Sequence, residues 1–325
     1  MILKLAHQLD PEIAHDLAIK ALSVAGEFSV CRILLNMLFS VSHSTYTVRD
    51  VKFPNRIGVA AGFDKNAEAW KALLALGFGH VEVGTVTPYP QKGCPKPRIF
   101  RLQHASLSNR MGFPNQGVWA AAERLDSPRP FEGLVGVNIG PNSDLLATGK
   151  GIPSSYSWSM RALETKADYF TLNISSPNSV SGFQSNASLL KDIFWEVRNA
   201  RKGLETRWCR SFPIFVKISP HLSEENLETI CRYVVDYGFD GLVTTNTDSL
   251  GVSGRRIKYA SLLTLMQVRE ILAGELMTLV SVGGIESRED VEKRFEAGAD
   301  LFQIYTSFVY QGPGVLRTLF PFSGT

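Results

Sequence analysis

Eight short apolar runs, rich in β-branched residues, recur along this chain and limit its fold more than any other feature. Most are separated by segments with helical spacing of apolar residues, such as 69–76 and 230–235. Alternating strands and helices indicate a parallel sheet buried on both faces, whose strands appear as continuous apolar runs. Eight such units predict an α/β fold, a closed (β/α)8 TIM barrel rather than an open sheet. The runs are 57–61, 81–86, 134–139, 169–174, 214–218, 241–245, 278–282 and 301–305.

Polar residues stand at the ends of these runs, most clearly where 169–174 leads into Ser175, Ser176, Pro177 and Asn178. Barrel enzymes build their active sites at the C-terminal ends of the strands. Asparagine offers both a donor and an acceptor, which suits a ligand with adjacent N–H and C=O groups. Any one of these ends is also a plausible turn built from turn formers. Their recurrence along the chain favours a site.

Two glycine-containing strand ends, Gly283-Gly284 and Ser253-Gly254, lie late in the sequence. Barrels often bind phosphate in the loops after their last two strands, through backbone N–H groups. The first pair leads into a helix that we expect to begin at about Arg288. The alternative is that the glycines only form tight turns.

Lys65 and Lys217 follow apolar runs, where a lysine is expected to be partly buried and to need a partner. A flavin that gains negative charge on reduction is one such partner, and a substrate carboxylate is another. The alternative for Lys65 is a salt bridge with its neighbour Asp64.

The bulk composition is that of a soluble globular protein, with 44% hydrophobic and 20% charged residues in a chain of 325. A net charge of +3, evenly spread, argues against a nucleic-acid partner. The four cysteines (Cys31, Cys94, Cys209 and Cys231) have no C-x-x-C spacing. We therefore expect no metal site and no disulfide framework, and a reducing compartment.

Residues 1–45 are predicted to form an N-terminal helical extension, and residues 46–325 the barrel. Asp10 and Pro11 are a typical helix start, with Asp as N-cap. A second apolar segment, 28–41, is interrupted by Arg32 and Asn36 and is too short to span a membrane. No cleavable signal peptide is indicated. The two helices either cap the barrel or lie in a membrane interface as an amphipathic hairpin.

The motifs of the chain, taken in order, resemble those of the class 2 (quinone-dependent) dihydroorotate dehydrogenase family. They include Ala-Ala-Gly-Phe-Asp-Lys at 60–65 and Asn-Ile-Ser-Ser-Pro-Asn at 173–178. Further matches occupy 9–15, 84–88, 97–102, 109–113, 138–140, 216–220, 245–247, 282–285 and 303–306.

The resemblance implies oxidation of (S)-dihydroorotate to orotate, the fourth step of de novo pyrimidine (UMP) biosynthesis, with FMN as cofactor and a membrane quinone as electron acceptor. Ser176 matches the catalytic base of the family. The matched substrate-binding residues are Lys65, Asn109, Arg110, Met111, Gly112, Phe113, Asn173, Asn178, Asn246 and Thr247. The matched FMN-binding residues are Ala61, Gly62, Thr85, Asn138, Asn173, Lys217, Thr245, Gly254, Gly284, Tyr305 and Thr306.

The resemblance also favours the membrane role for the N-terminal helices. In this family the extension forms a quinone tunnel, and His15 and Arg101 match positions that line it. We therefore expect peripheral membrane association, on the cytoplasmic face of the inner membrane if the protein is bacterial.

Two segments depart from the family pattern. Residues 179–184 lack the usual arginine of the substrate lid, and the loop from 248 to Gly254 is shorter than is typical. Arg255 and Arg256 are candidates to compensate as phosphate partners. The alternative function is an FMN-binding barrel paralogue that has an altered substrate or no catalytic activity.

Overall fold

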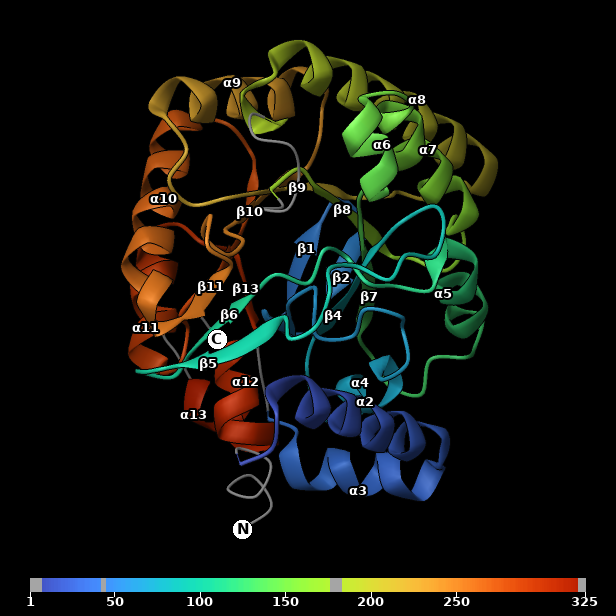
Figure 1. Cartoon of the computed structure of the whole chain (residues 1–325), viewed down its shortest axis with the longest axis vertical. Helices are drawn as coiled ribbons and strands as arrows, with labels where there is room; N and C mark the ends of the chain where they lie inside the picture. Colours follow the sequence, from blue (N-terminus) through green and yellow to red (C-terminus); the bar gives the residue numbers. More distant parts are fainter. Residues whose placement is uncertain (1–7, 42–44, 176–182, 321–325) are drawn as a thin grey trace.

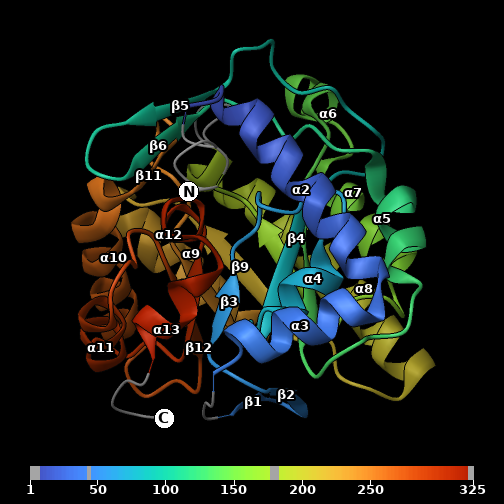
Figure 2. The same ribbon diagram turned by 90° about the horizontal axis from the view of Figure 1, so that it is seen from below.

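A closed barrel of eight parallel strands forms the centre of the protein, seen in a computed structural model that describes residues 8–41, 45–175 and 183–320. Each predicted run coincides with one strand, and their ends differ by at most two residues, so the predicted TIM barrel is confirmed. In order around the barrel (Figures 1 and 2), the strands are β10 (Gly241–Thr244), β12 (Thr278–Val282), β13 (Leu301–Ile304), β3 (Ile57–Val59), β4 (His80–Val86), β7 (Leu134–Ile139), β8 (Tyr169–Asn173) and β9 (Ile214–Ile218).

Helices surround the barrel, and their buried faces carry the apolar residues that the helical spacing predicts. In α9 (Glu224–Asp236), Leu227, Ile230 and Val234 are buried. The helix after Gly283-Gly284, α11, begins at Arg288 as expected, where Ser287 and Asp290 form a capping box. Besides α9, the helices of the ring are α4 (Trp70–Ala75), α5 (Gly117–Leu125), α6 (Ser143–Thr148), α7 (Ile152–Ala162), α8 (Ala187–Trp208), α10 (Lys258–Ile271), α11 (Arg288–Glu296), α12 (Thr306–Gln311) and α13 (Val315–Leu319).

The barrel interior changes from apolar to polar along its axis. Alternate residues of a strand point to the same side, so Tyr169, Thr171 and Asn173 of β8 all face inward. The ring of Tyr169 packs against Phe53 and Phe215 at one end. Thr171 and Asn173 instead donate hydrogen bonds to Glu82 and Thr85, two polar side chains of β4. The apolar end therefore closes the barrel, and the carboxyl end is left for a site.

Two small antiparallel sheets complete the fold, and the apolar pattern of the sequence did not predict them. A hairpin, β1 (Tyr46–Val48) and β2 (Val51–Phe53), brings Phe53 to the apolar end. A three-stranded sheet has the order β11 (Val252–Gly254), β6 (Ser106–Asn109) and β5 (Ile99–Leu102). The shortened loop before Gly254 is thus ordered as an edge strand paired with β6.

The N-terminal extension forms two helices, α2 (Pro11–Glu27) and α3 (Ser29–Phe39), that lie beside α4 on the outside of the barrel (Figures 1 and 2). The Asp10 carboxylate accepts hydrogen bonds from the backbone N–H groups of Glu12 and Ile13, which confirms the predicted N-cap. Gly26 permits a close approach to α4, because a Cβ there would lie 3.2 Å from Cβ of Lys71. Among the described residues, neither helix alone is long and apolar enough for a membrane span; the pair reaches that length and apolarity only together, across a bend of 109°.

A buried ion pair fastens α2 to the mouth of the barrel. The carboxylate of Glu12, which is 5% exposed, lies 2.8 Å from the Arg98 guanidinium and 3.0 Å from the Lys96 ammonium. Arg98 and Lys96 precede β5, so this contact joins the extension to the three-stranded sheet.

Replacing Arg98 with Met should loosen α2, because it removes the main partner of a buried carboxylate. We expect a loss of about 3 kcal/mol in the free energy of opening of α2, measured by hydrogen exchange of its amides. Lys293→Met is the control, since it breaks an exposed pair with Glu289 and should change stability by less than about 0.5 kcal/mol. Unchanged exchange in Arg98→Met would contradict this role for the pair.

Candidate active site

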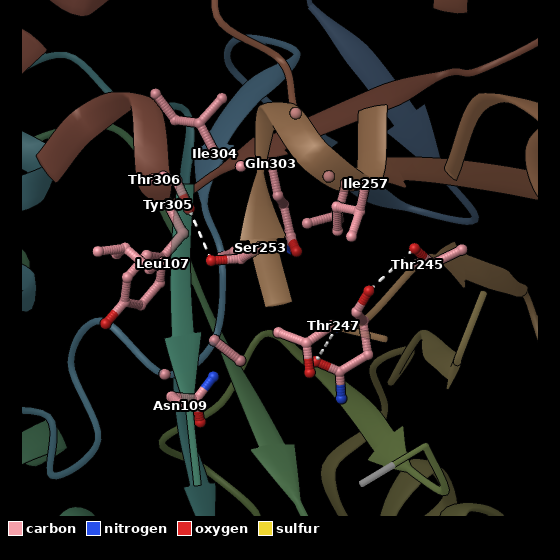
Figure 3. A pocket seen from close by; sticks show the side chains of 18 of the residues that line it. Leu107, Asn109, Thr245, Thr247, Ser253, Ile257, Gln303, Ile304, Tyr305 and Thr306 are labelled. Atoms are coloured by element: carbon pink, nitrogen blue, oxygen red, sulfur yellow. Dashed lines mark hydrogen bonds between the residues drawn. The ribbon is translucent and has the colours of Figure 1, made fainter. Parts of the chain in front are cut away.

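A cavity of about 350 Å³ opens at the carboxyl ends of the barrel strands. Figure 3 shows side chains from several elements gathered around it, including Asn109 of β6, Ser253 of β11 and Gln303 of β13. The position agrees with the sequence prediction of a site at the strand ends. The predicted residues that line the cavity are Ala61, Gly62, Lys65, Thr85, Asn109, Met111, Gly112, Phe113, Asn173, Lys217, Thr245, Asn246, Thr247, Gly254, Gly284, Tyr305 and Thr306.

The other predicted site residues lie beside the cavity or beyond it. Asn138 is fully buried behind Thr85, to which it is hydrogen-bonded. The Arg110 guanidinium donates to the Pro97 carbonyl and lies outside the cavity lining. Two further predicted residues, Ser176 and Asn178, fall in 176–182, outside the described part of the chain.

Alternating amides and hydroxyls form one continuous row of hydrogen bonds along the cavity wall. Thr85 Oγ1 donates to Asn138 Oδ1 at 2.7 Å, and Asn173 Nδ2 donates to Thr85 Oγ1 at 2.9 Å. Ser175 Oγ donates to Asn173 Oδ1 at 3.0 Å, and Asn246 Nδ2 donates to Ser175 Oγ at 2.9 Å. Four strand ends, those of β4, β7, β8 and β10, therefore share one polar wall. We call these five residues the polar row.

The polar row ends at the carboxylate of Glu82, a residue of β4 that is 0% exposed. Glu82 Oε1 accepts from Asn138 Nδ2 at 2.8 Å. Its Oε2 accepts from Thr171 Oγ1 at 2.9 Å and from Gln303 Nε2 at 2.8 Å. Glu82 was not among the residues predicted from the sequence, although an acid inside the apolar run 81–86 is itself an unusual signal.

Lys217 of β9 brings a buried positive charge to the cavity, and it is only 3% exposed. Burial lowers the pKa of its ammonium group, and the charge of Glu82 opposes that effect. Lys217 and Asn173 are directly paired in the β8–β9 ladder. The lysine therefore lies beside the polar row.

Lys65 brings a second ammonium group to the cavity, and its side chain is partly buried. Its Nζ donates to the Gly62 carbonyl at 2.7 Å and lies 3.4 Å from Nε2 of His15. Burial lowers its pKa to about 8, and the nearby Asp16 carboxylate partly offsets the effect. Asp64 does not supply the salt bridge considered above, since its carboxylate accepts from the backbone N–H groups of Glu68 and Ala69, both at 2.8 Å.

His15 links the N-terminal helices to the cavity. Its ring meets Phe63 edge to face, with 5.5 Å between ring centroids. Burial, together with the Lys65 charge, lowers its pKa to about 3, so the imidazole is neutral at physiological pH. Arg101, the other predicted quinone-site residue, donates to the Leu9 carbonyl just before α2. Both residues thus lie where α2 meets the barrel.

The two glycine-containing loops meet at one end of the cavity. A Cβ on Gly284 would lie 3.0 Å from the Gly254 carbonyl oxygen, and one on Gly254 would lie 2.4 Å from that of Ala105. Both have positive φ angles (74° and 84°) that favour glycine. Thr306 Oγ1 donates to Ser253 Oγ at 2.9 Å across this end (Figure 3). Arg255 lines this end of the cavity and donates a hydrogen bond to Glu286, whereas Arg256 does not line the cavity.

The chain matches the family model described as "Dihydroorotate dehydrogenase" over residues 44–320. It is 38% identical to "Dihydroorotate dehydrogenase (quinone)" of Marinomonas sp. over 96% of this chain and 93% of that protein. It is 41% identical to the protein of the same name from Chelativorans sp., over 94% of this chain and 85% of that protein. A crystal structure of DHODH from Eimeria tenella in complex with ferulenol superposes with a TM-score of 0.84 at 30% identity, covering 97% of this chain and 92% of that one.

Proposed function

This chain belongs to the dihydroorotate dehydrogenase family, and on that basis we propose that it oxidises dihydroorotate to orotate in pyrimidine biosynthesis, with a quinone as electron acceptor. The observation that carries the proposal is the convergence of Lys65, Asn109, Asn173 and Asn246 on one cavity at the barrel mouth. An ammonium group suits the carboxylate of dihydroorotate. Amide side chains suit the alternating N–H and C=O groups of its ring.

FMN is the cofactor that we propose, and two observations support its fit. The glycine-containing end of the cavity, at Gly254 and Gly284, has no room for side chains and leaves backbone groups accessible to a phosphate. Gln303 lines the cavity, and its Oε1 is buried without a hydrogen-bond partner among the described residues. When bound, FMN accepts a hydride from the substrate and passes electrons to the quinone.

The residues that we propose to hold FMN are those predicted from the family motifs and placed at or behind the cavity. Lys217 would face the flavin ring, where its positive charge stabilises negative charge that develops on reduction. Thr85, with Asn138 behind it, and Asn173 offer hydrogen bonds from the polar row. Gly254, Gly284 and Thr306 would surround the phosphate.

Ser176 is the proposed catalytic base that removes the proton from the substrate carbon. It follows Ser175, which is buried and fixed in the polar row by Asn173 and Asn246. A serine hydroxyl is a weak base at neutral pH, so it needs a relay that accepts its proton.

Ser176→Ala should retain bound FMN and lose dihydroorotate oxidation by at least about 100-fold, the typical contribution of a positioned base. The assay follows orotate formation with a short-chain quinone, with Ser185→Ala as the control for a serine outside the cavity lining. Turnover by the wild type establishes the function. Its absence in an FMN-loaded wild type would contradict the proposal, and full turnover by Ser176→Ala would remove that residue from the mechanism.

The pKa of Lys65 predicts a pH dependence of orotate binding. The ammonium form binds the carboxylate, and above a pKa of about 8 its fraction falls about tenfold with each pH unit. The dissociation constant of orotate should therefore be constant below about pH 7 and rise above about pH 8. Lys65→Arg keeps its charge, so its orotate affinity, even if lower, should not change over this range. A pH profile shared by both proteins would assign the titration to another group.

We further propose that the 1–45 extension is a unit distinct from the 46–325 barrel and that α2 and α3 bind a membrane surface, giving a lipid-soluble quinone access to the site past His15 and Arg101. Large apolar side chains on both helices are more than half exposed. They are Ile13, Leu17 and Val24 of α2 and Val30, Ile33, Leu34, Met37 and Leu38 of α3. For a bacterial cell, the location that we propose is peripheral, on the cytoplasmic face of the inner membrane.

Replacing Val30 and Met37 together with Asp should lower vesicle binding at least about tenfold, because both lie on one face of α3 and are 67% and 74% exposed. Leu276→Asp changes a fully exposed leucine outside the helix pair and is the matched control. Co-sedimentation with phospholipid vesicles measures binding. Oxidation of dihydroorotate with a water-soluble acceptor should be retained in both proteins, and undiminished vesicle binding by the double variant would contradict the membrane role.

A further inference from the structure

The reaction proposed above assigns no role to Glu82, although this residue places a charge in the closed interior of the barrel. Its carboxylate is 0% exposed and accepts hydrogen bonds from Asn138, Thr171 and Gln303, which belong to three other strands. Fully buried acids are rare unless they are paired.

Every donor in the polar row points back toward Glu82. A carboxylate can only accept, so Asn138 must turn its Nδ2 to Glu82, and its Oδ1 is left to accept from the Thr85 hydroxyl. Because the proton of Thr85 is thereby used, Thr85 can only accept from Asn173 Nδ2. The orientation of each group follows from the one before it.

At the end of the polar row away from Glu82, backbone N–H groups fix the amides of Asn173 and Asn246 in the same direction. The backbone N–H of Ser175 donates to Asn173 Oδ1 at 3.2 Å, and that of Thr247 donates to Asn246 Oδ1 at 2.9 Å. A backbone N–H can only donate, so Asn173 and Asn246 cannot turn over without losing it. Asn138 and Thr85 have no such backbone donor among the described contacts. Their orientation depends on Glu82.

Gln303 is oriented by the same carboxylate. Its Nε2 donates to Glu82 at 2.8 Å, and its Oε1 is buried without a hydrogen-bond partner among the described residues. Gln303 and Thr85 both line the cavity. Gln303 bonds to Oε2 of Glu82, and Thr85 is linked to Oε1 through Asn138. The carboxylate therefore decides which atom each of them presents.

We propose that Glu82 is a positioning residue whose acceptor-only carboxylate fixes the direction of the hydrogen bonds that Thr85 and Gln303 offer to the pyrimidine edge of a flavin ring or to a planar amide of like pattern. The inference rests on the proposed function for the identity of that ligand as FMN. The role assigned to Glu82 is to set the orientation of these side chains, without itself contacting the ligand.

Glu82→Gln is a nearly isosteric test. A carboxylate accepts from both Asn138 and Gln303, whereas the single oxygen of an amide can accept from only one of them. If the introduced amide turns its oxygen to Asn138, its nitrogen faces Gln303 Nε2, and Gln303 must flip. If it turns its nitrogen to Asn138, the amide of Asn138 flips and the Thr85 proton is released toward the cavity. In either case one cavity residue presents the wrong atom.

The double variant Glu82→Gln with Gln303→Glu should restore the wild-type pattern. The carboxylate introduced at position 303 accepts only, so the nitrogen of the amide introduced at position 82 turns to it. The oxygen of that amide then accepts from Asn138 again. Residue 303 presents an oxygen to the cavity, as it does in the wild type. The number of buried carboxylates is also unchanged.

The first measurement is the affinity of each apoprotein for FMN, from quenching of flavin fluorescence. We expect about a tenfold loss in Glu82→Gln, the effect of one misdirected hydrogen bond, and recovery to within about threefold in the double variant. Thr171→Val is the control, because it removes a donor to the same carboxylate but leaves its acceptor character intact. Its FMN affinity should stay within about twofold of the wild type.

Neutron diffraction from flavin-free crystals of Glu82→Gln gives a readout that needs no cofactor, since it distinguishes amide nitrogen from oxygen. A flipped Asn138 or Gln303 is expected. Wild-type orientations at both, or equal FMN affinity in Glu82→Gln and wild type, would overturn the inference. Failure of the wild type to bind FMN would instead overturn the proposed cofactor, and the diffraction result would still decide the role of Glu82.

Discussion

The buried carboxylate of Glu82 is the interaction on which the carboxyl end of the barrel depends. Side chains from β7, β8 and β13 converge on it, and it supplies the negative charge that opposes the effect of burial on Lys217. Below this level the interior is filled by rings such as Tyr169 and Phe215. The inward-facing residues of the strands thus form a polar layer above an apolar one, and only the carboxyl end of the barrel can hold an active site.

The N-terminal helices are joined to this site through a few polar contacts. Glu12 binds Arg98 and Lys96, and His15 lies 3.4 Å from the Lys65 ammonium group that we assign to the substrate carboxylate. A neutral, partly buried His15 places no competing charge beside that lysine. The extension therefore contacts residues of the cavity wall, which suits the quinone access that we propose.

The barrel could be predicted from the sequence because strands buried on both faces leave continuous apolar runs, and the site residues assigned from motif matches make up half of the cavity lining. The sheet of β5, β6 and β11 was missed because its short strands, such as Ser106–Asn109, have no such pattern. Glu82 was not predicted, and Ser175 and Gln303 lay within the matched motifs but were given no role, because these roles arise only when separate strands meet. The alternative of a paralogue with altered or no activity has no support from the comparisons, and the shortened loop still brings Gly254 to the cavity.

The most direct test of this account is an anaerobic absorbance spectrum of the FMN-loaded protein before and after addition of dihydroorotate, with no quinone present. The account predicts loss of the flavin band at about 450 nm and one orotate formed for each flavin reduced. It also predicts recovery of the band when quinone is added. A flavin band that persists in the presence of excess dihydroorotate would contradict the assignment of this cavity to dihydroorotate oxidation.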